Sequence, residues 1–165
     1  MTPMHPRAGE LIAALGLEPH PEGGYYRQVY RSVSTVTPAD DRGLRAALTT
    51  IYFLLPGTEV SRWHRVTSDE AWHFYEGAPQ ELLTADPAFT RIDRHVLGPV
   101  GPVHGQVHVV HAHDWQAARS SGDYTLVGCT VAPGFEFADF TMLRDMPDLA
   151  AHVRALHPGA ASLVD

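Results

Sequence analysis

The sequence predicts an all-β fold, an antiparallel sandwich or barrel that occupies residues 1–165 as one domain. From Ala46 onward, short apolar and β-branched runs follow one another, turn-forming residues separate them, and no helical pattern lies between them. Many short strands at regular spacing are typical of sandwiches and barrels rather than α/β sheets. A chain of 165 residues is also long enough to bury about 70% of its unfolded surface in one core.

A short helix is expected first, at 8–15. Leu11, Ile12 and Leu15 have helical spacing, and Gly16 follows as a C-terminal stop. The helix therefore presents one apolar face to the rest of the domain.

The β-rich part begins with a turn and a strand. "PHPEGG" (19–24) is rich in turn formers and leads into a strand at 25–31, whereas 34–45 has the composition of a surface loop. Seven further strands are expected, at 47–55, 60–66, 70–76, 80–85, 91–97, 105–115 and 123–132.

Two segments close the chain. In "PGFEFADF" (133–140) the alternating phenylalanines predict a core-facing side, with Glu136 and Asp139 pointing outward. "PDLAAHVRAL" (147–156) places its large apolar residues on one helical face and predicts a closing helix.

Charge and composition exclude several classes of partner. The net charge is −7 and no run of Lys or Arg occurs, which argues against nucleic acid and anionic membranes as partners. Cys129 is the single cysteine, so no intrachain disulfide can form. No apolar run approaches 18 residues, and the N-terminus lacks the pattern of a signal peptide. We therefore expect a cytoplasmic protein that binds a small molecule.

The stretch "SRWHRVTSDEAWHFYEG" (61–77) has the spacing of a metal-binding hairpin that lacks one ligand. His64, Glu70 and Gly77 fit the pattern G-x5-H-x-H-x3-E-x6-G, but Val66 stands where a second histidine belongs. His64 and Val66 lie two residues apart on one strand, so their side chains share a face. A turn then returns the chain, which lets Glu70 join that face inside a barrel.

A second motif, G-x5-P-x-G-x2-H, fits 105–116 in spacing only. His111 replaces the proline, His113 replaces the glycine, and Gln116 replaces the last metal-binding histidine.

Further blocks occur in a fixed order: "LIAALGLEPHPEGGYYRQVYRS", "TTIYFLL", "WHRVTSDEAWHFYEG", "HDWQAA" and "LVGCTVAPGFEFADF". Together with the two motifs they resemble the cupin-like group long filed as a domain of unknown function, the cupin-five group, over residues 11–143. The resemblance implies a double-stranded β-helix, the cupin jelly-roll barrel, with short N- and C-terminal helices. It also implies a homodimer, a pocket in the barrel mouth, and kinship to sugar-nucleotide epimerases. The chain departs from the group's pattern at "VVHAH" (109–113) and at Gln28, so no role is carried over there.

The metal is the first question for this pocket. Any divalent ion (Fe, Mn, Ni or Zn) would be held by His64, Glu70 and Gln116, and glutamine is a poor third ligand. A cluster of additional histidines could complete the set or lie on a solvated surface: His104, His108, His111 and His113. We expect no cofactor.

Acid–base chemistry is the metal-free alternative. His64 and Glu70 are the predicted catalytic pair, because a buried histidine beside a carboxylate can move protons next to a carbonyl group. The predicted substrate-binding residues lie on strands near the barrel: Tyr26, Arg27, Tyr52, Trp72 and Gln116. Arg27 would anchor a carboxylate or phosphate, unless it pairs with Glu22 at a dimer surface.

Three functions therefore compete. The leading hypothesis is an epimerase-like or isomerase-like enzyme, or a related lyase, that acts without metal on a small sugar or carboxylate. The alternatives are a cupin that binds a small ligand without turnover, and a metal-dependent enzyme that uses the extra histidines.

Overall fold

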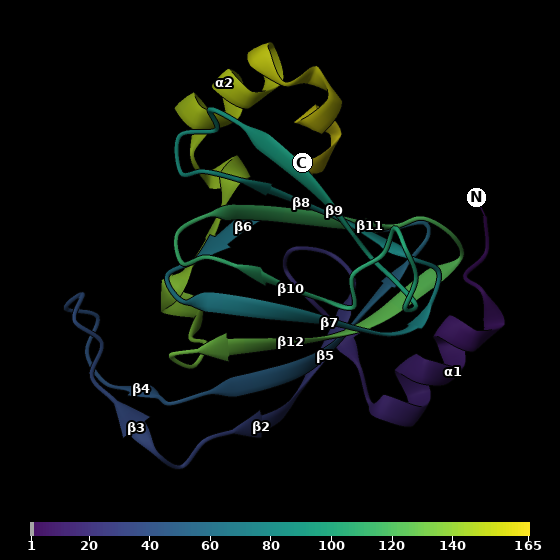
Figure 1. Cartoon of the computed structure of the whole chain (residues 1–165), viewed down its shortest axis with the longest axis horizontal. Helices are drawn as coiled ribbons and strands as arrows, with labels where there is room; N and C mark the ends of the chain where they lie inside the picture. The colour runs from purple at the N-terminus through teal and green to yellow at the C-terminus, as the bar shows by residue number, and fades with distance from the viewer. Residues whose placement is uncertain (1) are drawn as a thin grey trace.

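Two antiparallel β-sheets packed face to face form the body of the molecule in the computed structural model, which describes residues 2–165 (Figure 1). The first sheet has the order β1-β2-β5-β12-β7-β10, the second has the order β13-β6-β11-β8-β9, and β3 and β4 form a separate two-stranded ladder. The strands are β1 (Glu18–Pro19), β2 (Tyr25–Arg31), β3 (Thr35–Val36), β4 (Arg45–Ala46), β5 (Thr49–Pro56), β6 (Val60–Val66), β7 (Asp69–Gly77), β8 (Gln80–Ala85), β9 (Ile92–Leu97), β10 (Val107–Val110), β11 (Trp115–Ser120), β12 (Tyr124–Ala132) and β13 (Phe140–Met142). The helices are α1 (Pro6–Leu15) and α2 (Pro147–Leu156), with 3₁₀ turns η1 (Phe137–Asp139), η2 (Leu143–Asp145) and η3 (Pro158–Leu163). The predicted all-β fold with short terminal helices is confirmed.

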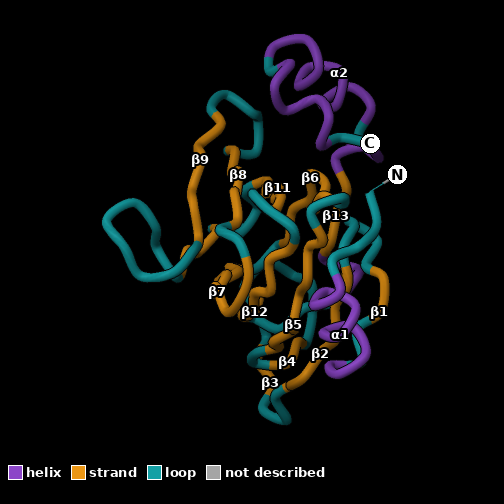
Figure 2. Tube along the Cα trace, turned by 90° about the vertical axis from the view of Figure 1, so that its right-hand side faces the viewer, coloured by secondary structure: helices purple, strands orange, loops and turns teal. Residues whose placement is uncertain are grey.

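Three apolar clusters hold these layers together. The central cluster takes residues from both sheets and lies between them, with Phe53, Trp72 and Leu82 among its buried members. A second cluster packs α2 and η3 onto the outer face of the five-stranded sheet around Trp63 and Trp115. The third seats α1 against the six-stranded sheet, and Figure 2 shows the two α-helices on separate parts of the molecule.

Both terminal helices form where their patterns predict them. The first begins at Pro6, two residues before the predicted start, because the His5 side chain accepts the Arg7 N–H at 3.2 Å and proline suits the first helical position. It ends at Gly16, whose φ of 63° is the left-handed conformation of a helix stop. No helix within residues 2–165 is long and apolar enough to cross a membrane.

The structure corrects the predictions for two segments, 105–115 and 34–45. The segment 105–115 is not one strand: β10 ends at Val110, and a turn carries the chain across to the other sheet before β11 begins. His113 lies in that turn with a φ of 71°, and its N–H donates to the Val66 carbonyl at 2.9 Å. The predicted loop 34–45 contains β3, which pairs with β4 at the end of the loop.

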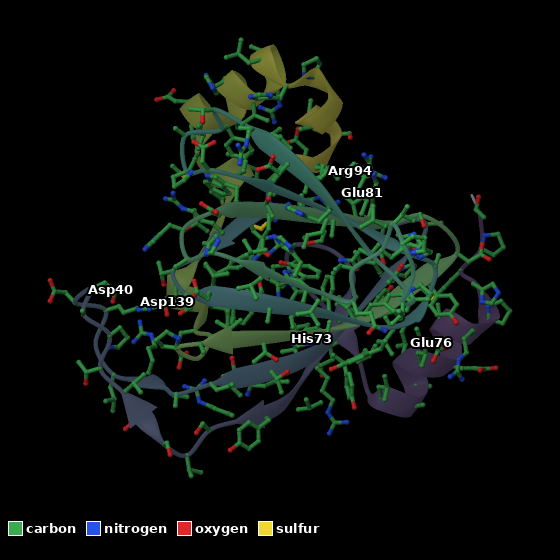
Figure 3. All side chains as sticks on the ribbon, viewed as in Figure 1. Asp40, His73, Glu76, Glu81, Arg94 and Asp139 are labelled. Carbon is green, nitrogen blue, oxygen red and sulfur yellow. The ribbon has the colours of Figure 1, made fainter. Side chains whose placement is uncertain are left out.

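The loop after β12 also differs from its predicted alternation. Phe137 is half-exposed, whereas Asp139 is buried, so the prediction that Asp139 points outward is wrong. Its carboxylate accepts two hydrogen bonds from Arg45, both at 2.8 Å, and lies 3.5 Å from Arg42. Figure 3 shows Asp139 beside Asp40, which also binds Arg42. This ion-pair cluster fixes the loop across one end of the barrel.

Candidate functional site

A cavity of about 270 Å³ opens between the sheets, at the end of the barrel covered by the loop after β12. Strands of both sheets, the turn at 19–24 and the loop at 133–140 supply its walls. The lining residues are His20, Glu22, Tyr26, Gln28, Arg31, Thr49, Ile51, His64, Val66, Glu70, Cys129, Val131, Phe135, Glu136, Phe137 and Phe140. The hairpin residues His64, Val66 and Glu70 therefore share this cavity, as their spacing predicts.

His64 is held by hydrogen bonds at both ring nitrogens. Nδ1 lies 2.7 Å from the Arg62 carbonyl, which only accepts, so Nδ1 carries a proton. Nε2 lies 2.8 Å from Oε2 of Glu22, and both side chains are almost fully buried. Burial alone would lower the pKa of His64, but the Glu22 carboxylate outweighs it and the pKa is raised. Burial likewise opposes the charge on Glu22, yet His64 holds the Glu22 pKa below its ordinary value. Both shifts favour the charged forms, an imidazolium beside a carboxylate.

The turn at 19–24 presses Glu22 against β6. The Glu22 carbonyl accepts the Arg62 N–H at 2.8 Å. Gly23 has a φ of 109°, and a Cβ there would lie 2.0 Å from the Val60 carbonyl oxygen, so only glycine fits. The close approach made possible by Gly23 brings the Glu22 carboxylate to His64.

Glu70 has a different environment, although it lines the same cavity. The Gln116 amide donates to its Oε1, and Trp72 Nε1 donates to the Gln116 carbonyl oxygen at 2.7 Å, which fixes the orientation of the amide. Burial raises the pKa of Glu70 to about 7, and the nearby Glu22 charge adds to the rise, while His64 and the Gln116 hydrogen bond oppose it. Glu70 is therefore poised to gain or lose a proton near neutral pH.

The donor atoms do not suit a resident divalent ion. Val66 supplies no ligand, both His64 nitrogens are engaged, and the Gln116 carbonyl oxygen accepts from Trp72. Within residues 2–165, no group of three or more His, Cys, Asp or Glu side chains has the arrangement of a metal site.

The histidine-rich segment lies outside the cavity lining. His108 stacks on His95 with ring centroids 3.7 Å apart, joining β10 to β9. His104 packs against the backbone of Gly98. The extra histidines therefore do not join His64 and Glu70.

The structure separates the predicted substrate-binding residues. Tyr26 lines the cavity, while Trp72 and Gln116 lie behind it and support Glu70. Arg27 lies outside and donates to the Leu15 carbonyl at the end of α1. Tyr52 also lies outside the lining, with its ring 6.2 Å from that of Tyr75.

The residues of the cavity that sequence reasoning missed include three with polar or charged side chains that matter for its chemistry: His20, Glu22 and Arg31. The glycine pair after Glu22 was the available signal, because it indicates a turn that approaches another backbone. Arg31 lies at the mouth, where it donates to the Phe135 carbonyl at 3.3 Å and forms an ion pair with Glu136.

Comparisons with known proteins agree with this architecture. A protein from Shewanella oneidensis is 32% identical, with a TM-score of 0.79 over 95% of this chain and 94% of that one. A hypothetical protein from Leishmania major is 29% identical, with a TM-score of 0.80 over 95% of this chain and 96% of that one. A dTDP sugar isomerase from Desulfovibrio desulfuricans G20 shares only the fold, at 12% identity and a TM-score of 0.50 over 72% of this chain and 80% of that one. The family model described as Cupin superfamily (DUF985) matches residues 9–143. No curated protein sequence matches the chain.

Proposed function

This chain belongs to the DUF985 family of the cupin superfamily, and we propose that its cavity carries out acid–base chemistry without a metal. Its fold is the predicted double-stranded β-helix. The proposed reaction is an isomerisation or epimerisation, in which a proton moves next to a carbonyl group of a small polar metabolite. The observation that carries the proposal is the pairing of two unlike groups in one cavity: His64 as a buried ion pair with Glu22, and Glu70 with a pKa of about 7. Groups with such different environments are typical of an acid and base that work together.

The roles follow from the charge states. Glu70, once ionised, accepts the proton from the carbon next to the carbonyl. Because both His64 nitrogens are engaged, the proton on Nε2 returns to the substrate through the Glu22 carboxylate, which also orients the ring and stabilises its charge. Both members of the predicted pair therefore have a role in the proposal, and the carboxylate that orients His64 is Glu22. Activity should rise as Glu70 ionises near pH 7 and fall at higher pH as His64 loses its proton.

The volume and the charges of the cavity limit the size and the chemical class of the substrate. A volume of about 270 Å³ suits a small metabolite, and Arg31 at the mouth offers guanidinium donors to a carboxylate or phosphate. The sugar isomerase shows that the fold can host isomerisation, but a shared fold by itself assigns no substrate.

Solvent exchange tests the proposal. Small carboxylates and acidic sugars that carry a carbonyl group would be incubated with the protein in D₂O, and deuterium at the adjacent carbon would be followed by NMR. We expect one of them to exchange with the wild type, and His64→Gln and Glu70→Gln to abolish that exchange. His152→Gln, a change at an exposed histidine on α2, is the matched control.

If His64→Gln exchanged the proton at the wild-type rate, the mechanism would be refuted. A compound that raises the melting temperature but is recovered without deuterium would instead support the alternative of a binding protein.

A further inference from the structure

His20 is a buried histidine of the cavity that has no part in the proton transfer proposed above. Its side chain is 6% exposed and lines the cavity beside Glu22. The Glu22 backbone N–H lies 3.1 Å from His20 Nδ1, whereas the Glu22 carboxylate oxygen Oε2 lies 3.8 Å from it. A backbone N–H only donates, so Nδ1 accepts this bond and carries no proton.

The proton of the neutral ring must then be on Nε2. Burial lowers the pKa of His20; the Glu22 carboxylate opposes this, and the nearby His64 charge lowers the pKa further, so the ring stays neutral beside the ion pair. Among residues 2–165, no side chain or carbonyl accepts a hydrogen bond from Nε2. The neutral ring therefore keeps one N–H free for another acceptor.

Neighbouring rings hold His20 in place. Tyr26 makes an edge contact with a centroid distance of 4.5 Å, and Phe140 and Phe53 lie at 5.8 and 6.0 Å. Nε2 is not among the fully buried polar atoms that lack a partner, so it is open to the cavity, and an oxygen that enters can accept its hydrogen bond in place of water. A fixed donor of this kind stabilises negative charge without first having to reorient.

We propose that His20 is a further catalytic residue, whose Nε2–H binds the carbonyl oxygen of the substrate. This inference rests on the proposed function and narrows its substrate class to compounds that form an enolate. Glu70 takes the proton from the adjacent carbon, the C–H electron pair becomes a C=C bond, and the carbonyl π electrons move to the oxygen. The oxygen then bears the negative charge against Nε2–H. When the carbonyl re-forms, the carbon takes the proton of His64 Nε2 through the Glu22 carboxylate, and solvent exchange returns His64 and Glu70 to their starting states.

The test uses oxalate, a planar dianion that resembles an enolate of a small acid, with ¹⁵N-histidine-labelled full-length protein. Two variants separate the two ring nitrogens. His20→Asn keeps an acceptor for the Glu22 N–H but has no donor at the place of Nε2. His20→Gln restores an N–H at that place. Thermal unfolding checks that both variants fold.

We expect the ¹⁵N signals of wild-type His20 to show that the proton is on Nε2. Oxalate should shift the Nε2–H signal and slow the exchange of that proton with solvent. His20→Asn should bind oxalate about 10–100-fold more weakly, the effect of losing one hydrogen bond to a charged acceptor, and His20→Gln should recover most of the affinity. Failure of the wild type to bind oxalate, an unmoved Nε2–H signal, or full affinity in His20→Asn would overturn the proposal. The response of the wild-type Nε2–H signal to oxalate tests the proposal even if His20→Asn does not fold.

The two proposals can fail separately. If oxalate binds through His20 but no compound exchanges its proton in D₂O, His20 is a binding residue and the proposed function is wrong. If proton exchange depends on His64 and Glu70 but not on the donor at position 20, the proposed function stands and this inference fails.

Discussion

The pKa of Glu70 can be tested without knowledge of the substrate, because a buried carboxyl group makes stability depend on pH. The change is Glu70→Gln, which keeps the shape of the side chain and an oxygen that can accept from Gln116 but cannot ionise. Below the ordinary pKa of 4.5, Glu70 is protonated in both the folded and unfolded states and behaves like glutamine. As the pH rises above 4.5, the unfolded state ionises first, and the wild type loses stability until the folded state also ionises at about 7.

The size of the effect follows from the two pKa values. One pKa unit corresponds to about 1.4 kcal/mol, so a rise from 4.5 to about 7 corresponds to a loss of about 3 kcal/mol in the wild type. The glutamine variant escapes this loss. Its free energy of unfolding, relative to the wild type, should therefore increase by about 3 kcal/mol between about pH 4 and about pH 8.

Urea unfolding of both proteins at a series of pH values measures this difference, and other titrating groups cancel in the comparison. Glu18→Gln, at an exposed glutamate of β1, is the matched control and should show a difference that does not vary with pH. If the Glu70→Gln difference were also constant from about pH 4 to about pH 8, Glu70 would not be a carboxyl group of raised pKa, and its role as a base near pH 7 would have to be abandoned.

Three further predictions concern two residues that hold the site in shape and the metal content of the protein. Gly23→Ala should lower the free energy of unfolding by at least about 1–3 kcal/mol, because a Cβ would meet the Val60 carbonyl and the backbone is left-handed there. Chemical denaturation measures this loss, and Gly9→Ala, whose Cβ would meet no other atom within 4 Å, should show none. Trp72→Phe removes the hydrogen bond to the Gln116 carbonyl oxygen and should lower the free energy of unfolding by about 1–3 kcal/mol in the same assay. An unchanged denaturation midpoint would mean that this bond does not support the Gln116 amide. Elemental analysis of untagged protein purified without chelator should find substoichiometric metal, and one ion per chain would contradict the acid–base mechanism.

The fold could be predicted because its signals are local. Strand runs, turn formers and the spacing of His64, Val66 and Glu70 depend on near neighbours in the chain, and the structure places these three side chains in one cavity. The break after Val110 was missed because the turn at 111–114 contains no glycine or proline, and His113 adopts there a left-handed conformation that is uncommon for its residue type.

The parts that could not be predicted depend on contacts between distant segments. The partner of His64 is Glu22, far back in the chain, and nothing in the hairpin itself indicates it. The sequence pattern predicted that Asp139 points outward, because it does not show that Arg45 and Arg42 neutralise the buried carboxylate. Residue patterns report which face of a strand is apolar, but they do not report which buried charges meet.

The origin of Glu22 in a turn before the first long strand has a consequence for how such a pocket can change through evolution. The barrel hairpin supplies His64, whereas the residue that sets its charge comes from a separate, short segment at the edge of the sheet. Replacing that segment would alter the proton affinity of His64 while the strands of the barrel keep their sequence. The chemistry of the pocket and the architecture that holds it can therefore diverge independently.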